Sequence, residues 1–340
     1  MKRIIAFGEL MLRLSPEGYL RFLQAEKLNA AFGGAEANVA VGLAALGMNT
    51  AFVTKLPEHE IGQMAVNSLR KVGVDTSCIT RGGGRTGIYF VEKGASQRSS
   101  KVIYDRADSA VAKAVTGDFD WNKILDKADW FHWTGITPAL GESVTAILEQ
   151  ALKVCREKKI TVSCDLNYRK NLWTKDKARE TMAKLMPFVN VCIANEEDAG
   201  DVFGINAEST DVNSGKLSRE GYKSVAKQLA AKFGFDKVAI TLRGSVSAND
   251  NNWSGILYDG NKFYLAKNYA IHIVDRVGGG DSFGAGLIYA LINNYNLQKA
   301  IEFAVAASCL KQTIEGDYNL VSADEVNKLL QGDGSGRVIR

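Results

Sequence analysis

Short apolar runs alternate along this chain with longer stretches in which apolar residues recur every three or four positions. The runs have the length and composition of parallel strands buried on both faces, and they cover residues 4–7, 51–54, 130–133, 160–164, 189–194 and 237–242. Helical periodicity is clear over 144–155 and 222–233, and Ser322 opens a capping box before a further helix. The alternation predicts an α/β fold with a doubly wound, mostly parallel sheet that binds ligands at the carboxyl ends of its strands.

Two segments depart from this rhythm. In residues 12–32 the apolar positions follow no clear periodicity. Residues 86–106 have the pattern of a hairpin, with two β-like runs around a polar turn. We expect these segments to form a small β-sheet that projects from the core as a lid. The glycine-rich residues 332–340 are expected to be a flexible tail. The α/β core would then comprise residues 1–11, 33–85 and 107–331.

Composition narrows the class of protein. The 340 residues carry a net charge of only +4, without a block of lysines and arginines, so a dedicated nucleic-acid surface is not expected. The five cysteines lie far apart and without metal-ligand spacing, which favours free thiols in a reducing compartment. The apolar run at the N-terminus is interrupted by Glu9 and is too short for a signal peptide, and no run has the length of a membrane span. We therefore predict a cytoplasmic protein without a membrane partner.

Two glycine clusters have the composition of phosphate-binding loops, but their contexts differ. Residues 82–87 fit G-x-G-x-x-G, yet a strand pattern follows where a dinucleotide-binding turn needs a helix, so a plain loop is favoured. Residues 278–280, all glycine, precede Asp281 and a helical segment over 284–292. Glycines at the start of a helix expose backbone N–H groups that can hold a phosphate. The spacing alone leaves open whether Asp281 is chemically active or only caps the helix.

The turn at residues 278–281 resembles the second signature of the ribokinase-like (PfkB-type) carbohydrate kinases, whose final aspartate is the catalytic base. Their first signature is matched by residues 33–38, and residues 195–198 lie where the family has an N-x-x-E motif that organises magnesium and phosphate. The resemblance covers essentially the whole chain. It implies a ribokinase-like fold, ATP and Mg²⁺ as cofactors, and a catalytic group formed by Asp281 and the amides of Gly278, Gly279 and Gly280.

The expected sugar depends on the residues after the first strand and on two arginines. Many neutral-sugar kinases of this family carry an aspartate just after the first strand, where this chain has Met11 and Leu12. The segments around Arg106 and Arg169 resemble those of 2-keto-3-deoxygluconate kinases, and a guanidinium suits a carboxylate or keto oxygen. Without the resemblance, an arginine beside an aspartate is more often part of a surface ion pair. The resemblance implies sugar-acid contacts from Gly34, Asn38, Tyr89, Tyr104, Arg106, Arg169, Asp281 and Asp317.

The nucleotide is expected to lie across the ends of two core strands and the glycine turn. Asp198 stands where the family has glutamate, so the resemblance leaves Glu197 and Asp198 as alternatives for an outer-shell magnesium role. The segment after Gly244 also lacks the second glycine common in the family. The nucleotide contacts that the resemblance implies are Asn195, Thr241, Arg243, Gly244, Ser245, Gly278 and Gly280.

These features together predict an ATP-dependent kinase that makes the 6-phosphate of 2-keto-3-deoxygluconate. Its partners would be the sugar acid, ATP and a second copy of the chain, paired through the lid sheets. A fructokinase or another keto-sugar-acid kinase is the alternative within the family. Outside the enzymes, a catalytically silent sugar-binding protein is disfavoured by the intact glycine turn and Asp281. A dehydrogenase is disfavoured by the misplaced motif at residues 82–87.

Overall fold

The structure is a computed structural model that describes residues 2–195, 197–206 and 219–332. Within these residues the main sheet has ten strands in the order β13-β12-β11-β10-β9-β8-β1-β4-β5, with β14 paired to β12. In this order, the strands β11, β10, β9, β8, β1, β4 and β5 are each parallel to their neighbours in the series, and β12 pairs antiparallel with β11, β13 and β14. The strands are β1 (Arg3–Phe7), β4 (Asn49–Leu56), β5 (Ile79–Arg81), β8 (Trp130–Thr134), β9 (Thr161–Asp165), β10 (Val191–Ala194), β11 (Lys237–Ser245), β12 (Asp250–Tyr258), β13 (Phe263–Leu265) and β14 (Tyr269–His272). The predicted α/β class is confirmed, and each predicted apolar run forms or overlaps one of these strands.

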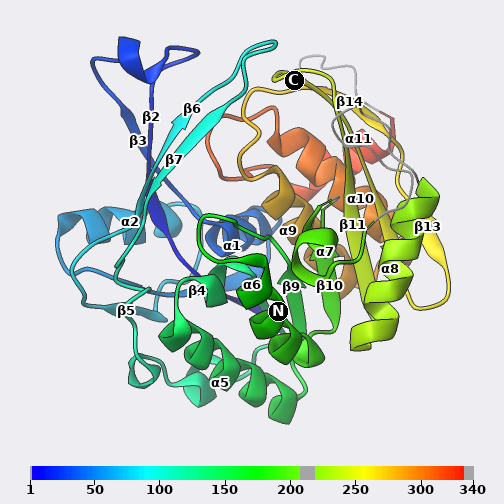
Figure 1. Cartoon of the computed structure of the whole chain (residues 1–340), viewed down its shortest axis with the longest axis horizontal. Helices are drawn as coiled ribbons and strands as arrows, with labels where there is room; N and C mark the ends of the chain where they lie inside the picture. The colour runs from blue at the N-terminus through cyan, green and yellow to red at the C-terminus, as the bar shows by residue number, and fades with distance from the viewer. Residues whose placement is uncertain (1, 196, 207–218, 333–340) are drawn as a thin grey trace.

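Helices cover both faces of the main sheet (Figure 1), because successive side chains of a buried strand point to opposite sides. In β1, Ile5 and Phe7 pack in one cluster with α5 (Glu142–Lys158), whereas Ile4 packs with α1 (Ala35–Ala45) and α9 (Gly279–Ile292) on the other side. This arrangement is the predicted doubly wound core. The other helical segments are α2 (Glu60–Arg70), η1 (Phe22–Gln24), η2 (Thr116–Asp118), α3 (Trp121–Ile124), α4 (Ile136–Ala139), α6 (Lys175–Leu185), η3 (Met186–Phe188), α7 (Asp198–Phe203), α8 (Arg219–Phe233), α10 (Leu297–Lys311) and α11 (Ala323–Leu330).

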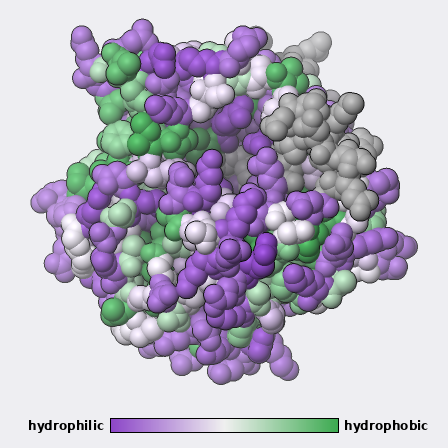
Figure 2. Space-filling view, viewed as in Figure 1, coloured by the Kyte–Doolittle hydropathy of each residue, from purple (hydrophilic) through white to green (hydrophobic). Residues whose placement is uncertain are grey.

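A second, four-stranded sheet stands beside the α/β core, at the upper left of Figure 1. Its strand order is β3-β2-β6-β7, and its strands come from the two segments that lack helical periodicity. Every residue of the edge strand β7 is exposed, and Figure 2 shows apolar side chains gathered on this side of the molecule. The predicted small sheet is confirmed, whereas its action as a lid and its pairing with a second copy stay predictions. The strands are β2 (Met11–Ser15), β3 (Asn29–Gly33), β6 (Ile88–Glu92) and β7 (Lys101–Asp105).

The start of α9 differs from the sequence expectation. The helix begins at Gly279, five residues before the predicted segment, because Gly278 turns the chain with a left-handed φ of 80°. Asp281 therefore lies inside the first turn and does not cap the helix. Two other expectations are confirmed: Ser322 forms a capping box with Glu325, and residues 82–87 lead into strand β6 without forming a helix.

Other sequence expectations have simpler outcomes. All five cysteines are free, three of them buried and two half-buried. Among the residues that the structure describes, no helix combines the length and apolar character needed to cross a membrane. The predicted flexible tail lies outside the described residues, apart from Gly332.

Candidate active site

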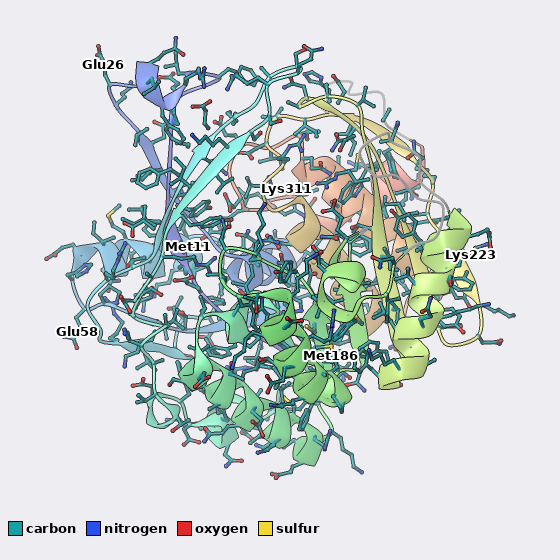
Figure 3. The ribbon with its side chains drawn as sticks, in the orientation of Figure 1. Met11, Glu26, Glu58, Met186, Lys223 and Lys311 are labelled. Carbon is teal, nitrogen blue, oxygen red and sulfur yellow. The ribbon has the colours of Figure 1, made fainter. Side chains whose placement is uncertain are left out.

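A cavity of about 340 Å³ lies where the carboxyl ends of β9, β10 and β11 meet the turn into α9 and the small sheet. Met11, labelled in Figure 3, belongs to its small-sheet side. The position agrees with the rule that open α/β sheets bind ligands at strand carboxyl ends. The predicted site residues in its wall are Gly34, Asn38, Tyr89, Tyr104, Arg106, Arg169, Asn195, Asp198, Thr241, Arg243, Gly278, Gly279, Gly280, Asp281 and Asp317.

Three predicted residues do not line this cavity. Gly244 and Ser245 continue strand β11 and pair with β12, so the expected nucleotide loop is part of a hairpin at this point. The side chain of Glu197 is exposed and lines a neighbouring groove, whereas Asp198 is buried in the cavity wall. Of the two alternatives for the magnesium role, Asp198 is thus the one that reaches the cavity.

The glycine turn is shaped by a close approach of backbone to backbone. A Cβ on Gly278 would collide with the carbonyl oxygen of Asp317, and its positive φ also favours glycine. The amide of Gly279 bonds to the Arg276 carbonyl at 3.2 Å, and the Ser282 amide bonds to the Gly278 carbonyl. The first-turn amides without a partner among the described residues are therefore those of Gly280 and Asp281. These two amides can hold an anion at the positive end of the helix.

The carboxyl group of Asp281 lies in the first turn of α9, and its surroundings raise its pKa. Its carboxylate accepts a hydrogen bond of 2.7 Å from the Asn38 side-chain amide, and the Asn38 carbonyl oxygen faces the Gly34 amide at 3.3 Å. Burial raises the pKa of Asp281 to about 7, and the negative charge of Asp317 adds to the rise, while Asn38 and the Arg169 charge oppose it. A carboxylate with a pKa near neutrality is suited to general-base work. Asn38, predicted as a sugar contact, thus also holds this carboxylate in place.

The small-sheet side of the cavity is formed by side chains that already have protein partners. Tyr89 donates a 2.6 Å hydrogen bond to Asp317, and its ring stacks on Tyr104 with centroids 6.1 Å apart. Arg106 lies over the Tyr104 ring and forms a buried ion pair with Glu9, with Nε 2.8 Å from the carboxylate. Arg106 is therefore not a surface residue paired with the aspartate beside it. It is a buried donor whose charge is balanced by Glu9.

Arg169 differs from Arg106 in its partners. It follows strand β9 and donates to the backbone carbonyl of Tyr168 at 2.9 Å. Within the described residues, no carboxylate lies within ion-pair distance of its guanidinium. Its positive charge lowers the pKa of both Asp165 and Asp281, although burial still raises each of them. Arg169 thus offers the cavity a positive charge that no ion pair within the described part of the chain neutralises.

Comparison with known proteins identifies the family. The family model described as pfkB family carbohydrate kinase matches residues 1–323. The chain belongs to the PfkB family. It is 51% identical to 2-dehydro-3-deoxygluconokinase from Thermotoga maritima, whose crystal structure superposes with a TM-score of 0.93 over 97% of this chain and 98% of that one.

Two further relatives agree with this assignment. A PfkB family carbohydrate kinase from Listeria grayi is 32% identical, with a TM-score of 0.90 over 97% of this chain and 100% of its own. A 2-dehydro-3-deoxygalactonokinase from Haloferax volcanii is 33% identical over 98% of both chains. The predicted family, the ribokinase-like fold and the carbohydrate-kinase activity are thereby confirmed.

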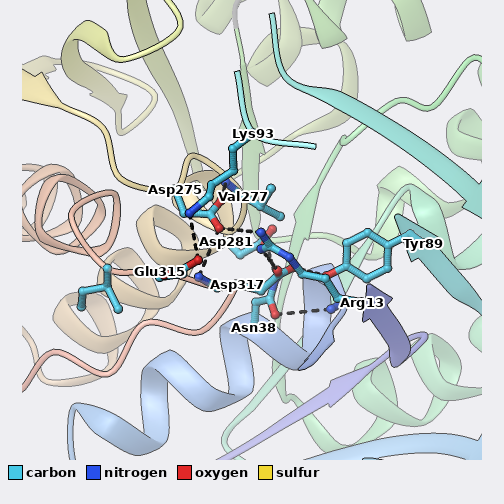
Figure 4. Close-up of polar contacts among 12 residues, drawn as sticks. Arg13, Asn38, Tyr89, Lys93, Asp275, Val277, Asp281, Glu315 and Asp317 are labelled. Carbon is cyan, nitrogen blue, oxygen red and sulfur yellow. Dashed lines mark hydrogen bonds and ion pairs between the residues drawn. The ribbon is translucent and has the colours of Figure 1, made fainter. Parts of the chain in front are cut away.

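In this PfkB kinase, sequence reasoning missed a group of buried charges behind the cavity wall. Arg13 of β2 contacts Asp275 and Asp317, each at 2.6 Å (Figure 4), and Glu9 pairs with Arg106. A pattern in the sequence could have revealed Arg13. Alternation along β2 puts it on the same face as Met11, and both side chains are buried. A charged residue at an inward position of a strand needs a buried partner.

Proposed function

We propose that the chain is an ATP-dependent 2-keto-3-deoxygluconate kinase that transfers a phosphoryl group to the 6-hydroxyl. The observation that carries the proposal is the combination, in one cavity, of Asp281 with a pKa near 7, the amides of Gly280 and Asp281, and Arg169. Neither the amides nor the guanidinium of Arg169 has a hydrogen-bond or ion-pair partner on a side chain of the described residues. 2-Keto-3-deoxygluconate and 2-dehydro-3-deoxygluconate are the same compound, so the name of the Thermotoga maritima relative supports this substrate.

The proposed chemistry needs little more than positioning and charge. Asp281 accepts the proton of the attacking hydroxyl, while Asn38 holds its carboxylate in place. The amides of Gly280 and Asp281 stabilise negative charge that develops on the transferred group. Arg169 binds the carboxylate of the sugar acid. Arg106, whose charge is balanced by Glu9, donates hydrogen bonds to the keto and hydroxyl oxygens of the sugar acid.

Mg²⁺ is expected to enter with ATP. The described residues contain no cluster of three or more His, Cys, Asp or Glu side chains able to hold a metal ion, which fits an ion held mainly by phosphate oxygens and water. Asp165 and Asp198 would face it. Burial and the charges of Asp198 and Asp281 raise the pKa of Asp165, and a cation nearby would relieve that repulsion. When bound, Mg²⁺ would neutralise part of the phosphate charge.

The galactonate epimer is the second candidate substrate, because the Haloferax volcanii relative is a 2-dehydro-3-deoxygalactonokinase. A coupled ADP-release assay would compare kcat/KM for both keto-deoxy acids, fructose and ribose. We expect the gluconate acid to be preferred and fructose to be disfavoured by orders of magnitude, because it leaves Arg169 without its anionic partner. A preference for fructose would end the sugar-acid proposal and leave the carbohydrate-kinase assignment in place.

Two expectations accompany this proposal. A kinase that draws on the ATP pool would work in the cytoplasm. A homo-oligomer would cover the exposed apolar residues of β7, namely Val102, Ile103 and Tyr104.

A further inference from the structure

Arg13 is a buried arginine whose backbone lies in the small sheet and whose guanidinium reaches the core. Only 2% of its side chain is exposed. Its two terminal nitrogens contact different carboxylates, Nη2 that of Asp275 and Nη1 that of Asp317, each at 2.6 Å. Burying an unpaired guanidinium is costly, so this double ion pair fixes where Arg13 and its strand must lie.

Asp275 connects Arg13 to the turn that precedes α9. Its Oδ2 accepts from Arg13 and from the Gly316 amide at 3.1 Å, and its Oδ1 accepts from the Val277 amide at 3.1 Å. From α10, the buried ammonium of Lys311 (Figure 3) donates to the backbone carbonyls of Asp275 and Gly316 at 3.1 and 2.6 Å. The turn is thus held by one cation from the small sheet and another from the core.

Asp317 connects the same arginine to the sugar side of the cavity. Its Oδ1 accepts from Arg13 and its Oδ2 from the Tyr89 hydroxyl at 2.6 Å. A Cβ on Gly33 would collide with this carboxylate, which gives the first glycine of the family signature a physical reason. The backbone of Asp317 also packs against Gly278. Arg13 of β2 therefore contacts Asp275, which precedes the glycine turn, and Asp317, which packs against Gly278 and also binds Tyr89 of β6.

We propose that Arg13 is a positioning residue for phosphoryl transfer. By holding Asp275 and Asp317 side by side, it sets the amides of Gly280 and Asp281 at a fixed place relative to the sugar on the small-sheet side. The proposal rests on the proposed function for the identity of the sugar, but not for the phosphoryl transfer itself.

The test compares Arg13→Met and Arg13→Lys with the full-length wild type, on whichever sugar the wild type phosphorylates best. We expect Arg13→Met to lower kcat by about 10- to 100-fold, because a displacement of about 1 Å in the reacting geometry costs that much. The KM for the sugar should rise about tenfold through Asp317, and the KM for ATP should stay within about twofold. Arg13→Lys should recover only part of kcat, because an ammonium lacks the planar fork that spans two carboxylates.

Arg3→Met is the matched control. Arg3 lies in β1, is half-buried and pairs with Asp75 at 3.2 Å, away from the cavity. Its loss should lower the melting temperature and leave kcat and both KM values unchanged. All variants would be assayed at a temperature where circular dichroism shows them folded. If Arg13→Met does not fold, the comparison uses Arg13→Lys.

A pH profile separates positioning from a general loss of stability. Removing Arg13 leaves the carboxylates of Asp275 and Asp317 without their guanidinium. The negative charge of Asp317, which helps to raise the pKa of Asp281, is then no longer balanced. The acid limb of kcat/KM for the sugar should then move to higher pH in Arg13→Met and stay in place in Arg3→Met. Variants of Arg13 with wild-type kcat, sugar KM and acid limb would overturn the proposal. A wild type that prefers a neutral sugar would overturn only the substrate assignment.

Discussion

The cavity has two sides built on different principles. On the core side lie the carboxyl group of Asp281 with a raised pKa, two backbone amides and Arg169. Among the residues that the structure describes, these amides have no hydrogen-bond partner and Arg169 has no ion-pair partner. On the small-sheet side, the predicted contact residues already contact other side chains. Arg106 forms an ion pair with Glu9, Tyr89 donates a hydrogen bond to Asp317, and the ring of Tyr104 stacks on that of Tyr89. The core side therefore offers groups that are available for chemistry, whereas the small-sheet side offers charges that are already balanced by ion pairs.

Among the substitutions on the core side, replacement of Asp281 should reduce kcat most. We expect Asp281→Asn to lower kcat by at least ~10²-fold, because an amide cannot accept the hydroxyl proton. ATP binding should survive, since the Gly280 amide and the turn are unchanged. Steady-state kinetics with a separate measurement of ATP affinity would check this. A variant with nearly normal kcat would remove Asp281 from the mechanism.

The stability of Asp281→Asn provides the control. The pKa of Asp281 is about 7 in the folded state, above the ordinary value of 3.8 expected in the unfolded state. Between pH 3.8 and about 7, the folded state therefore binds more protons at Asp281 than the unfolded state does. Stability contributed by this group is present below about pH 4 and is lost as the pH rises through about 7. The variant should therefore melt higher than wild type at pH 8, by roughly 2 °C or more, and the difference should vanish near pH 4.

The two arginines give the second-largest contrast. Arg169→Ala should raise the KM for the sugar acid about 10- to 150-fold, the equivalent of one charge-assisted hydrogen bond of about 1.5–3 kcal/mol. Arg106→Ala should also weaken binding of the sugar acid, but it should weaken binding of fructose by the same factor, because the charge of Arg106 is already balanced by Glu9. KM values for the acid and fructose in both variants would measure this difference. Arg85→Ala is a matched control outside the cavity lining, where Arg85 pairs with Asp105. Equal selectivity losses in the two cavity variants would contradict the assignment of charge to Arg169 alone.

The pH dependence of the wild type should follow the core side. Because Asp281 must be ionised to accept a proton, kcat/KM should fall about tenfold for each pH unit below about 7 and level off above it. The measurement is kcat/KM for the sugar acid from pH 5.5 to 8.5 at constant ionic strength. A profile that is flat down to pH 5.5 would show that the base has an ordinary carboxyl pKa.

The main sheet was predictable because it depends on local patterns, whereas the kinase chemistry was predicted from the resemblance of residues 33–38 and 278–281 to the family signatures. The six apolar runs identify core strands, and glycines before an aspartate identify the turn into α9. The helix start was misplaced because glycines have low helix propensity, which tertiary packing overrides here at Gly279. A periodicity argument cannot foresee that Gly278 makes the turn by adopting a positive φ.

The buried ion pairs could not be predicted in the same way. Arg13 contacts residues more than 250 positions away, and Arg106 bonds to Glu9 across 97 positions. Nothing in the local sequence tells an arginine which distant carboxylate it will meet. The surface ion pair suggested by the aspartate beside Arg106 was wrong, because that aspartate, Asp105, pairs with Arg85.

The smallest predicted effect tests whether the small sheet moves. If residues 87–106 close over the sugar, their amide exchange should slow when the sugar acid is added, since exchange then requires an opening that expels the ligand. At ten times the Kd, an opening of this kind slows by roughly tenfold. Hydrogen exchange on peptides from β6 and β7 would measure it, with β13 (Phe263–Leu265), which lies outside the cavity lining, as the internal control.

Arg13 makes this experiment informative about which strands can move. Its double ion pair fixes β2 to the core, whereas β7 is an edge strand with every residue exposed. We therefore expect slowing in β7, which carries Tyr104, and little change in β2. Equal slowing in both strands would mean that the sheet moves as one body, against the tie through Arg13. Unchanged exchange in β7, with binding shown by calorimetry, would mean that the small sheet is a fixed wall and not a lid.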